Sequence, residues 1–167
     1  IDVKEFKPSE AVSKISKLKE DGIRADDYIK RGRIFGESQY ENMCKIYSSY
    51  EKICNDENSV DFSELLLRTV ELLESNDEIR ALQHRRFKEI LVDEFQDTNS
   101  IQYKFLKLMA GKNSHVMVVG DDDQSIYGWR GADYTNMHKF LKDFDDVEVL
   151  GWIQNKLDTL ESTHLGL

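Results

Sequence analysis

The chain has 167 residues, of which 40% are hydrophobic and 33% charged, a size that suits one compact domain or one domain with part of another. No stretch approaches the ~20 apolar residues of a membrane span, so we expect no membrane partner. Two cysteines without metal-ligand spacing favour a reducing, cytoplasmic setting. A net charge of −9 disfavours non-specific nucleic-acid binding, because Lys and Arg supply most of that affinity.

The first half of the chain is predicted to be almost wholly helical. Pro8 favours a helix start and Gly22 its end. A second helix over residues 36–54 would place one apolar face inward, made of Tyr40, Met43, Ile46, Tyr47, Tyr50 and Ile53. Asp61 is expected to cap a third helix, whose buried stripe would comprise Phe62, Leu65, Leu66, Thr69, Leu72 and Leu73.

The pattern changes at residue 89. Residues 89–93 (EILVD) and 115–123 (HVMVVGDDD) are apolar runs that both end on acids. Between them, residues 100–111 predict a helix capped by Asn99. This strand–helix–strand order predicts two parallel strands in a buried sheet, with both acidic clusters at the ends where such sheets bind ligands.

Two later segments would continue the alternation. A helix is expected over about 133–142, followed by a short strand-like run, VEVL, at 147–150. The whole chain is therefore predicted to be of the α/β class, with helices before the sheet.

The first acidic cluster, residues 93–97 (DEFQD), has the chemistry of a metal-dependent site. Adjacent acids at the end of an apolar strand cost stability unless a cation is near. Mg²⁺ on nucleotide phosphates is one such cation, because it prefers one or two carboxylates and keeps several waters. One acid could hold the metal while the other activates water. Alternatively, the acids only cap a turn and the next helix.

The second cluster is GDDDQSIYGWRGA, residues 120–132. Gln124 could hydrogen-bond a γ-phosphate, and Tyr127 and Trp129 could stack on unpaired bases. Arg130 could contact a phosphate or pair with an acid. The alternative is that the two aromatic residues belong to the core and Arg130 is their surface partner.

Together the two clusters resemble a known family. ILVDEFQDTN (90–99) and VVGDDDQSIYGWRGAD (118–133) are similar to motifs II and III of UvrD/Rep-type superfamily I DNA helicases. Residues 60–73 and 82–103 favour the DNA-repair type, UvrD, within that family. The resemblance implies an ATP-dependent 3′→5′ DNA helicase of repair or replication, with ATP and Mg²⁺ as substrate and cofactor.

The resemblance also implies an architecture. Residues 61–150 would be the C-terminal part of a RecA-like P-loop NTPase motor domain (1A), with parallel strands and crossover helices. Residues 1–60 would belong to a preceding helical subdomain (1B), and residues 151–167 would form a divergent tail.

The family's residue roles carry over position by position. Asp93 would coordinate Mg²⁺, and Glu94 would be the catalytic base. Gln96 and Asp97 would support the nucleotide site and its link to DNA. In the second motif Gln124 would sense the γ-phosphate. The coupling to single-stranded DNA would be made by Tyr127, Trp129 and Arg130, and Arg130 would also contact the nucleotide.

The chain departs from the family in two respects. It contains no G-x-x-x-x-G-K-[ST] phosphate loop, and Leu157 stands where the family has an arginine. We therefore expect an internal helicase fragment without ATPase activity of its own, whose partners are the missing helicase segments, other repair proteins and, weakly, single-stranded DNA. A module that binds single strands or the intact helicase, and an unrelated Mg²⁺-dependent hydrolase or scaffold, remain as alternatives.

Overall fold

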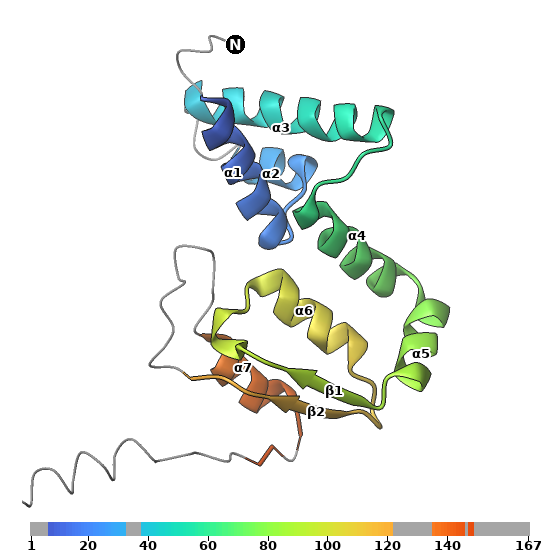
Figure 1. Cartoon of the computed structure of the whole chain (residues 1–167). Helices are drawn as coiled ribbons and strands as arrows, with labels where there is room; N and C mark the ends of the chain where they lie inside the picture. Colours follow the sequence, from blue (N-terminus) through green and yellow to red (C-terminus); the bar gives the residue numbers. More distant parts are fainter. Residues whose placement is uncertain (1–6, 33–37, 122–134, 146, 149–167) are drawn as a thin grey trace, which may run out of the picture. The chain divides into compact units, whose positions relative to one another are not determined.

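The computed structural model describes residues 7–32, 38–121, 135–145 and 147–148 (Figure 1). The chain divides into two compact units, Ile1–Met137 and His138–Leu167. In chain order the first unit contains α1 (Pro8–Glu20), α2 (Ala25–Gly32), α3 (Ser38–Asp56), α4 (Phe62–Ser75), α5 (Asp77–Arg86), β1 (Glu89–Val92), a 3₁₀ turn (Phe95–Asp97), α6 (Ser100–Met109) and β2 (His115–Val118). The last described helix, α7 (Thr135–Asp143), runs from the first unit into the second.

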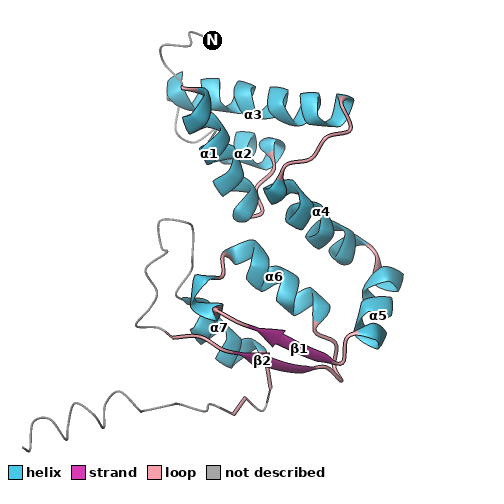
Figure 2. Ribbon diagram, in the orientation of Figure 1, coloured by secondary structure: helices cyan, strands magenta, loops and turns pink. Residues whose placement is uncertain are grey.

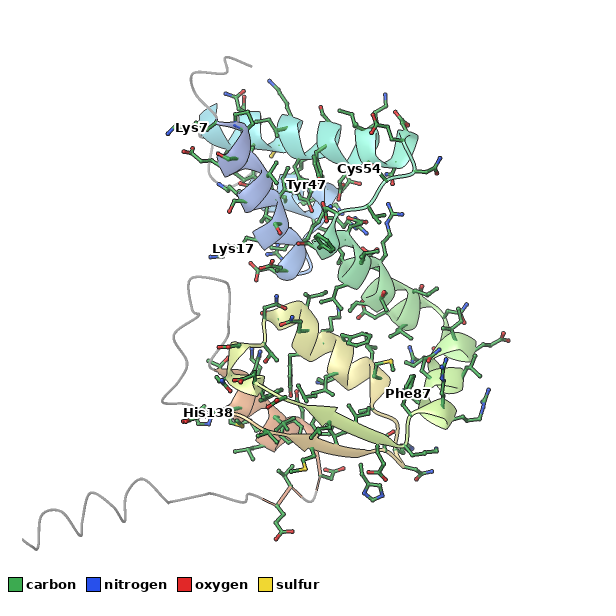
Figure 3. The ribbon with its side chains drawn as sticks, viewed as in Figure 1. Lys7, Lys17, Tyr47, Cys54, Phe87 and His138 are labelled. Carbon is green, nitrogen blue, oxygen red and sulfur yellow. The ribbon has the colours of Figure 1, made fainter. Side chains whose placement is uncertain are left out.

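The N-terminal helices form where the sequence predicts them. Pro8 opens α1, where its missing N–H is not needed, and Gly22 follows the helix with φ +73°, a conformation that glycine adopts without strain. On α3, Met43 and Tyr47 are fully buried, and the Tyr47 hydroxyl donates to the Ile23 carbonyl oxygen at 2.8 Å (Figure 3). The predicted face of this helix is thus confirmed, except that Ile53 is exposed. The short α2 was not predicted as a separate helix.

The predicted stripe of α4 is wrong, although its cap is right. Asp61 accepts a hydrogen bond from the Glu64 backbone N–H at 2.7 Å and so begins the helix as expected. The residues that α4 buries are Glu64, Leu67, Val70 and Leu73. Of the predicted stripe, Leu73 is buried and Leu66 is partly buried, whereas Phe62, Leu65, Thr69 and Leu72 are exposed.

The physical reason lies in the composition of this helix. Apolar residues occupy more than one face of α4, so periodicity alone does not choose between them. Packing against Ile101 of α6 selects the face that contains Leu67 and Val70.

The strand–helix–strand prediction is confirmed. β1 and β2 pair in parallel from Glu89↔His115 to Val92↔Val118, and α6 lies between them in sequence (Figure 2). Asn99 caps α6 in a capping box: its side chain accepts from the Gln102 N–H at 3.0 Å, and the Gln102 side chain accepts from the Asn99 N–H at 2.9 Å.

The prediction of a buried sheet is wrong for the described strands. Leu91 and Met117 are partners in the register, and both are exposed, Leu91 by 69%. Their neighbours Val92 and Val118 are only half-buried. Alternation of this kind is what a sheet shows when one face is covered and the other is not. Val147 and Glu148 are not in a strand, and the rest of the predicted 147–150 run lies outside the described residues.

A cluster of paired charges ties the N-terminal helices together, and we call it the Glu64 network. The Lys19 ammonium, 1% exposed, lies 2.7 Å from Asp61 and 2.8 Å from Glu64. Arg24 reaches Glu64 at 2.7 Å and binds Glu71 through two parallel hydrogen bonds of 2.7 Å each. The outer members are Tyr50, Glu51, Asn55 and Arg68.

The charges of this network support one another. Burial opposes ionisation of Glu64, but hydrogen bonds from Lys19, Arg68 and Arg24 outweigh it and lower its pKa to about 2. The two hydrogen bonds that Arg24 donates to Glu71 raise the pKa of Arg24. Glu64 and Arg24 therefore stay ionised at neutral pH.

Within the part of the chain that the structure describes, no helix combines the length and the apolar character needed to cross a membrane.

Candidate functional site

The first acidic cluster lies where β1 ends. Asp93 and Glu94 follow the strand directly and are both exposed. β2 ends at the same edge of the sheet, because the two strands are parallel, and Gly120 and Asp121 follow it. Glu94 has φ +51° and ψ +42°, the left-handed region that residues other than glycine seldom occupy. Such backbone strain persists only where the surroundings hold it, and it is common at functional sites.

Neutral groups hold the two acids. The Glu94 N–H donates to Asp93 Oδ1 at 2.9 Å, and Gln96 Nε2 donates to Glu94 Oε2 at 2.6 Å. Among the described residues, no ion pair involves Asp93, Glu94 or Asp97. No cation among the described residues therefore neutralises the carboxylates of these three residues, and charges of this kind are stabilised when a cation is near.

Gln96 joins the ends of the two strands. Its side chain is 5% exposed, and its Oε1 accepts a hydrogen bond from the Asp121 N–H at 3.0 Å. A Cβ added at Gly120 would lie 2.7 Å from that oxygen, closer than real contacts allow. Glycine at position 120 thus permits the close approach of the two segments.

Backbone, ring and side-chain contacts hold the turn that follows Glu94. The Phe95 N–H donates to the Val119 carbonyl oxygen at 2.9 Å, and the buried Phe95 ring meets Tyr103 edge-on, with centroids 6.2 Å apart. Asn136, at the start of α7, donates from Nδ2 to the Thr98 carbonyl oxygen at 3.0 Å and to Thr98 Oγ1 at 3.2 Å.

A pocket of about 620 Å³ opens beside these acids. It runs along β1 and α6, and Asp93, Glu94 and Asp97 line one end of it. Asp97 Oδ1 is buried and has no hydrogen-bond partner among the described residues. A buried carboxylate oxygen without a partner is costly, so this end of the pocket is suited to a group that carries donors or positive charge.

The donor set fits Mg²⁺ bound to a ligand but not a free-standing metal centre. In the described ranges, no group of three or more His, Cys, Asp or Glu side chains is arranged to hold a metal ion. Mg²⁺ usually needs only one or two carboxylates, since phosphates and water complete its shell. Asp93 and Glu94 supply hard oxygen atoms of this kind at an exposed edge.

The structure brings together four of the predicted site residues, Asp93, Glu94, Gln96 and Asp97. The others, Gln124, Tyr127, Trp129 and Arg130, lie outside the described residues. Sequence reasoning missed Gly120 and Asn136. The one hint of a role for Gly120 was its place directly before the acids of the second cluster. Nothing in the local pattern marks Asn136.

Comparison with known proteins places the chain in a family. Residues 1–145 match the UvrD/REP helicase N-terminal domain. The chain is 50% identical over 158 residues to DNA helicase II of Haemophilus influenzae and 42% identical over 159 residues to DNA helicase II of Escherichia coli. It is 34% identical over 159 residues to the ATP-dependent DNA helicase PcrA of Leuconostoc citreum.

Each of these matches covers 95% of this chain but only 21% or 22% of the relative, so the chain spans about a fifth of their length. The family match extends over the helices, both strands and both acidic clusters. The chain belongs to the UvrD/REP helicase N-terminal domain family.

Proposed function

We propose that this chain supplies the metal- and water-positioning part of the ATP site of a 3′→5′ DNA helicase. Residues 61–150 would be part of a RecA-like motor domain, residues 1–60 part of helical subdomain 1B, and residues 151–167 a divergent tail. The names of the relatives, DNA helicase II and an ATP-dependent DNA helicase, support this assignment.

The observation that carries the proposal is the pair of exposed acids at the carboxyl end of β1, which neutral donors hold and which no cation among the described residues pairs with. In the proposed site Asp93 holds Mg²⁺, and Glu94 accepts the proton of the attacking water. Bound Mg²⁺ would supply charge stabilisation for the phosphates. Asp97, whose Oδ1 lacks a partner among the described residues, would take a donor from the nucleotide site.

The second motif would couple this site to DNA. We assign to Gln124 a hydrogen bond to the γ-phosphate, and to Tyr127 and Trp129 stacking on single-stranded bases. Arg130 would contact both the nucleotide and the DNA. Support comes from the family membership of residues 1–145, which include this segment. The helicase segments outside this chain, or other repair proteins, would be its partners.

A chimera tests the proposal directly. This chain would replace the matching segment of Haemophilus influenzae DNA helicase II, to which it is 50% identical. We expect the chimera to hydrolyse ATP with stimulation by single-stranded DNA, and Glu94→Gln to lower kcat by about 10²–10⁴-fold, the usual contribution of a general base.

Glu89→Gln is the matched control, because Glu89 is also exposed but begins β1, whereas Glu94 lies beyond the other end of that strand. An active chimera that tolerates Glu94→Gln as well as Glu89→Gln would refute the assigned role. The isolated chain is expected to show no ATPase activity, because it contains no phosphate loop.

The proposal also limits the DNA affinity of the isolated chain. Two stacked aromatic residues contribute a few kcal/mol, whereas even millimolar affinity needs about 4 kcal/mol, and the net charge of −9 opposes binding. We expect a Kd no better than high micromolar for labelled oligothymidine in fluorescence anisotropy, with Trp129→Ala removing most of it. Nanomolar binding would favour the alternative, a partial module that binds single strands by itself.

A further inference from the structure

We infer that Gln96 and Asn136 are positioning residues: the Gln96 amide joins the Glu94–Thr98 turn to Asp121, which precedes segment 122–134, and the Asn136 amide joins the same turn to α7, which follows it. The inference rests on the proposed function, because it explains how the Glu94 carboxylate would be held in place relative to the second motif. Neither residue needs to contact the nucleotide for this role.

Gln96 makes the first connection, and the chemistry requires an amide of this length. Its Nε2 donates to Glu94 Oε2 at 2.6 Å while its Oε1 accepts from the Asp121 N–H at 3.0 Å. A carboxylate at this position would keep the second bond but lose the donor of the first. Because the side chain is almost fully buried and Gly120 leaves room for it, the two bonds have little freedom to rearrange.

Asn136 makes the second connection, at Thr98, where the same turn ends. Its side chain is 1% exposed, and its Nδ2 donates to both the carbonyl oxygen and the hydroxyl of Thr98. The Thr98 hydroxyl in turn donates to the Phe95 carbonyl oxygen at 2.7 Å. The hydrogen bonds of Asn136 therefore reach the backbone of the turn that begins at Glu94.

The two connections converge on three consecutive residues. Asp121 precedes segment 122–134 and Asn136 follows it closely, yet both are bonded to residues between Gln96 and Thr98. Glu94 adopts a strained left-handed backbone, which needs such support from outside the turn. A shift of the Glu94 carboxylate would thus strain the hydrogen bonds at both ends of the segment that contains Gln124 and Trp129. A shift of that segment would likewise move the turn that holds Glu94.

The first test uses the purified chain and amide hydrogen exchange by NMR. Gln96→Met keeps the length of the side chain but removes both hydrogen bonds, and it should speed exchange of the Asp121 amide by about tenfold. Gln96→Glu keeps the acceptor and should leave that amide protected. Gln102→Met is the control, because the Gln102 side chain makes its hydrogen bond among the described residues within the α6 cap. Equal protection in the parent and in Gln96→Met would overturn the inference.

The second test uses the chimera with DNA helicase II. We expect Gln96→Met, Gln96→Glu and Asn136→Asp to lower kcat for ATP by about 10-fold or more while KM changes less than about twofold, as outer partners of catalytic groups do. The stimulation by single-stranded DNA should fall as well, which a loss of stability alone would not produce. Gln102→Met and Asn113→Asp, an exchange at an exposed loop residue, should behave like the parent.

The outcomes separate the two ideas. If the parent chimera shows no DNA-stimulated ATPase, the proposed function fails, and the positioning role fails with it. If the parent is active and the Gln96 variants match it in kcat and DNA stimulation, the positioning role alone is refuted. Gln96→Glu keeps the test valid should Asn136→Asp lower the melting temperature too far for assay.

Discussion

The carboxylates of the Glu64 network and those of the Asp93–Glu94 turn differ in their burial and in the charge of their partners. Glu64 is 3% exposed and forms ion pairs with three cationic residues, Lys19, Arg24 and Arg68. Asp93 and Glu94 are exposed, and within the described ranges they receive neutral N–H donors and form no ion pair. Each carboxylate of the first group is paired with a cation of the chain, whereas those of the second have no cationic partner among the described residues.

This difference separates structural acids from candidate functional ones. A buried ion network has to be complete, because a single uncompensated charge in a low-dielectric interior costs several kcal/mol. Unpaired acids at a strand end tend to repel each other, and a fold retains them where a metal or a proton acceptor is required. Identical residue types can thus be sorted by their partners rather than by sequence motif.

The largest effect should follow from breaking the network. Glu64→Ala leaves the fully buried Lys19 with Asp61 as its one remaining anionic partner among the described residues and removes one partner of Arg24, so we expect a loss of about 3–5 kcal/mol in the free energy of unfolding. Urea denaturation of the chain would measure it.

Glu74→Ala is the control for that measurement. Glu74 pairs with Lys104 at 2.9 Å, but both side chains are largely exposed, and such pairs contribute less than about 1 kcal/mol. Equal losses in the two variants would remove the distinction between the network and ordinary surface pairs.

Acid should weaken the same network. The pKa of Glu64 is lowered to about 2 in the folded chain, from an ordinary value of 4.5, so its contribution is complete above pH 4.5 and is lost as pH falls towards 2. The pKa of Asp61 is also lowered: burial opposes this, but hydrogen bonds from Lys19 and Tyr50 prevail. Burial raises the pKa of Glu20, which acts with the opposite sign.

We expect Glu64 alone to account for about 3 kcal/mol of the stability lost over this range. Unfolding curves of the parent and of Glu64→Gln, recorded from pH 6 to pH 2, provide the measurement. The variant should be less stable at pH 6 and should lose less stability in acid. Parallel curves for the two proteins would contradict the role given to Glu64.

A smaller effect is expected at the junction of the two strand ends. The new Cβ in Gly120→Ala would lie 2.7 Å from Gln96 Oε1 and 3.2 Å from the Gln96 backbone N, so we expect a cost of about 1–2 kcal/mol. In a Gln96→Ala background the same change should cost less than half as much, because the nearest atom is gone. A double-mutant cycle by thermal unfolding would show whether the two positions are coupled.

The smallest change in stability is expected at the candidate site itself. Neutralising an acid by Asp93→Asn or Glu94→Gln removes no ion pair among the described residues, and it relieves repulsion between neighbours. The free energy of unfolding should stay within about 0.5 kcal/mol of the parent or rise slightly. A loss as large as that of Glu64→Ala would mean that these acids are structural, and the contrast between the two regions would disappear.

Local signals determined much of this protein from sequence alone. Pro8, Asp61 and Asn99 predicted helix starts because proline and short side chains with oxygen acceptors satisfy the first turn of a helix wherever it lies. The strand–helix–strand order predicted a parallel pair, and two motifs were sufficient to indicate the helicase family. All of these depend on neighbours within a few residues, or on long uninterrupted matches.

Tertiary structure decided what depends on distant partners. Periodicity could not choose the buried face of α4, because apolar residues line several faces and only the contact with Ile101 selects one. The sequence did not show that Lys19 would meet Glu64, or that Asn136 would bond Thr98, since these partners are 38 or more positions apart. Such long-range pairs decide whether a carboxylate is neutralised by a cation of the chain or left free for a ligand. The reason is that charges are compensated across space and not along the chain.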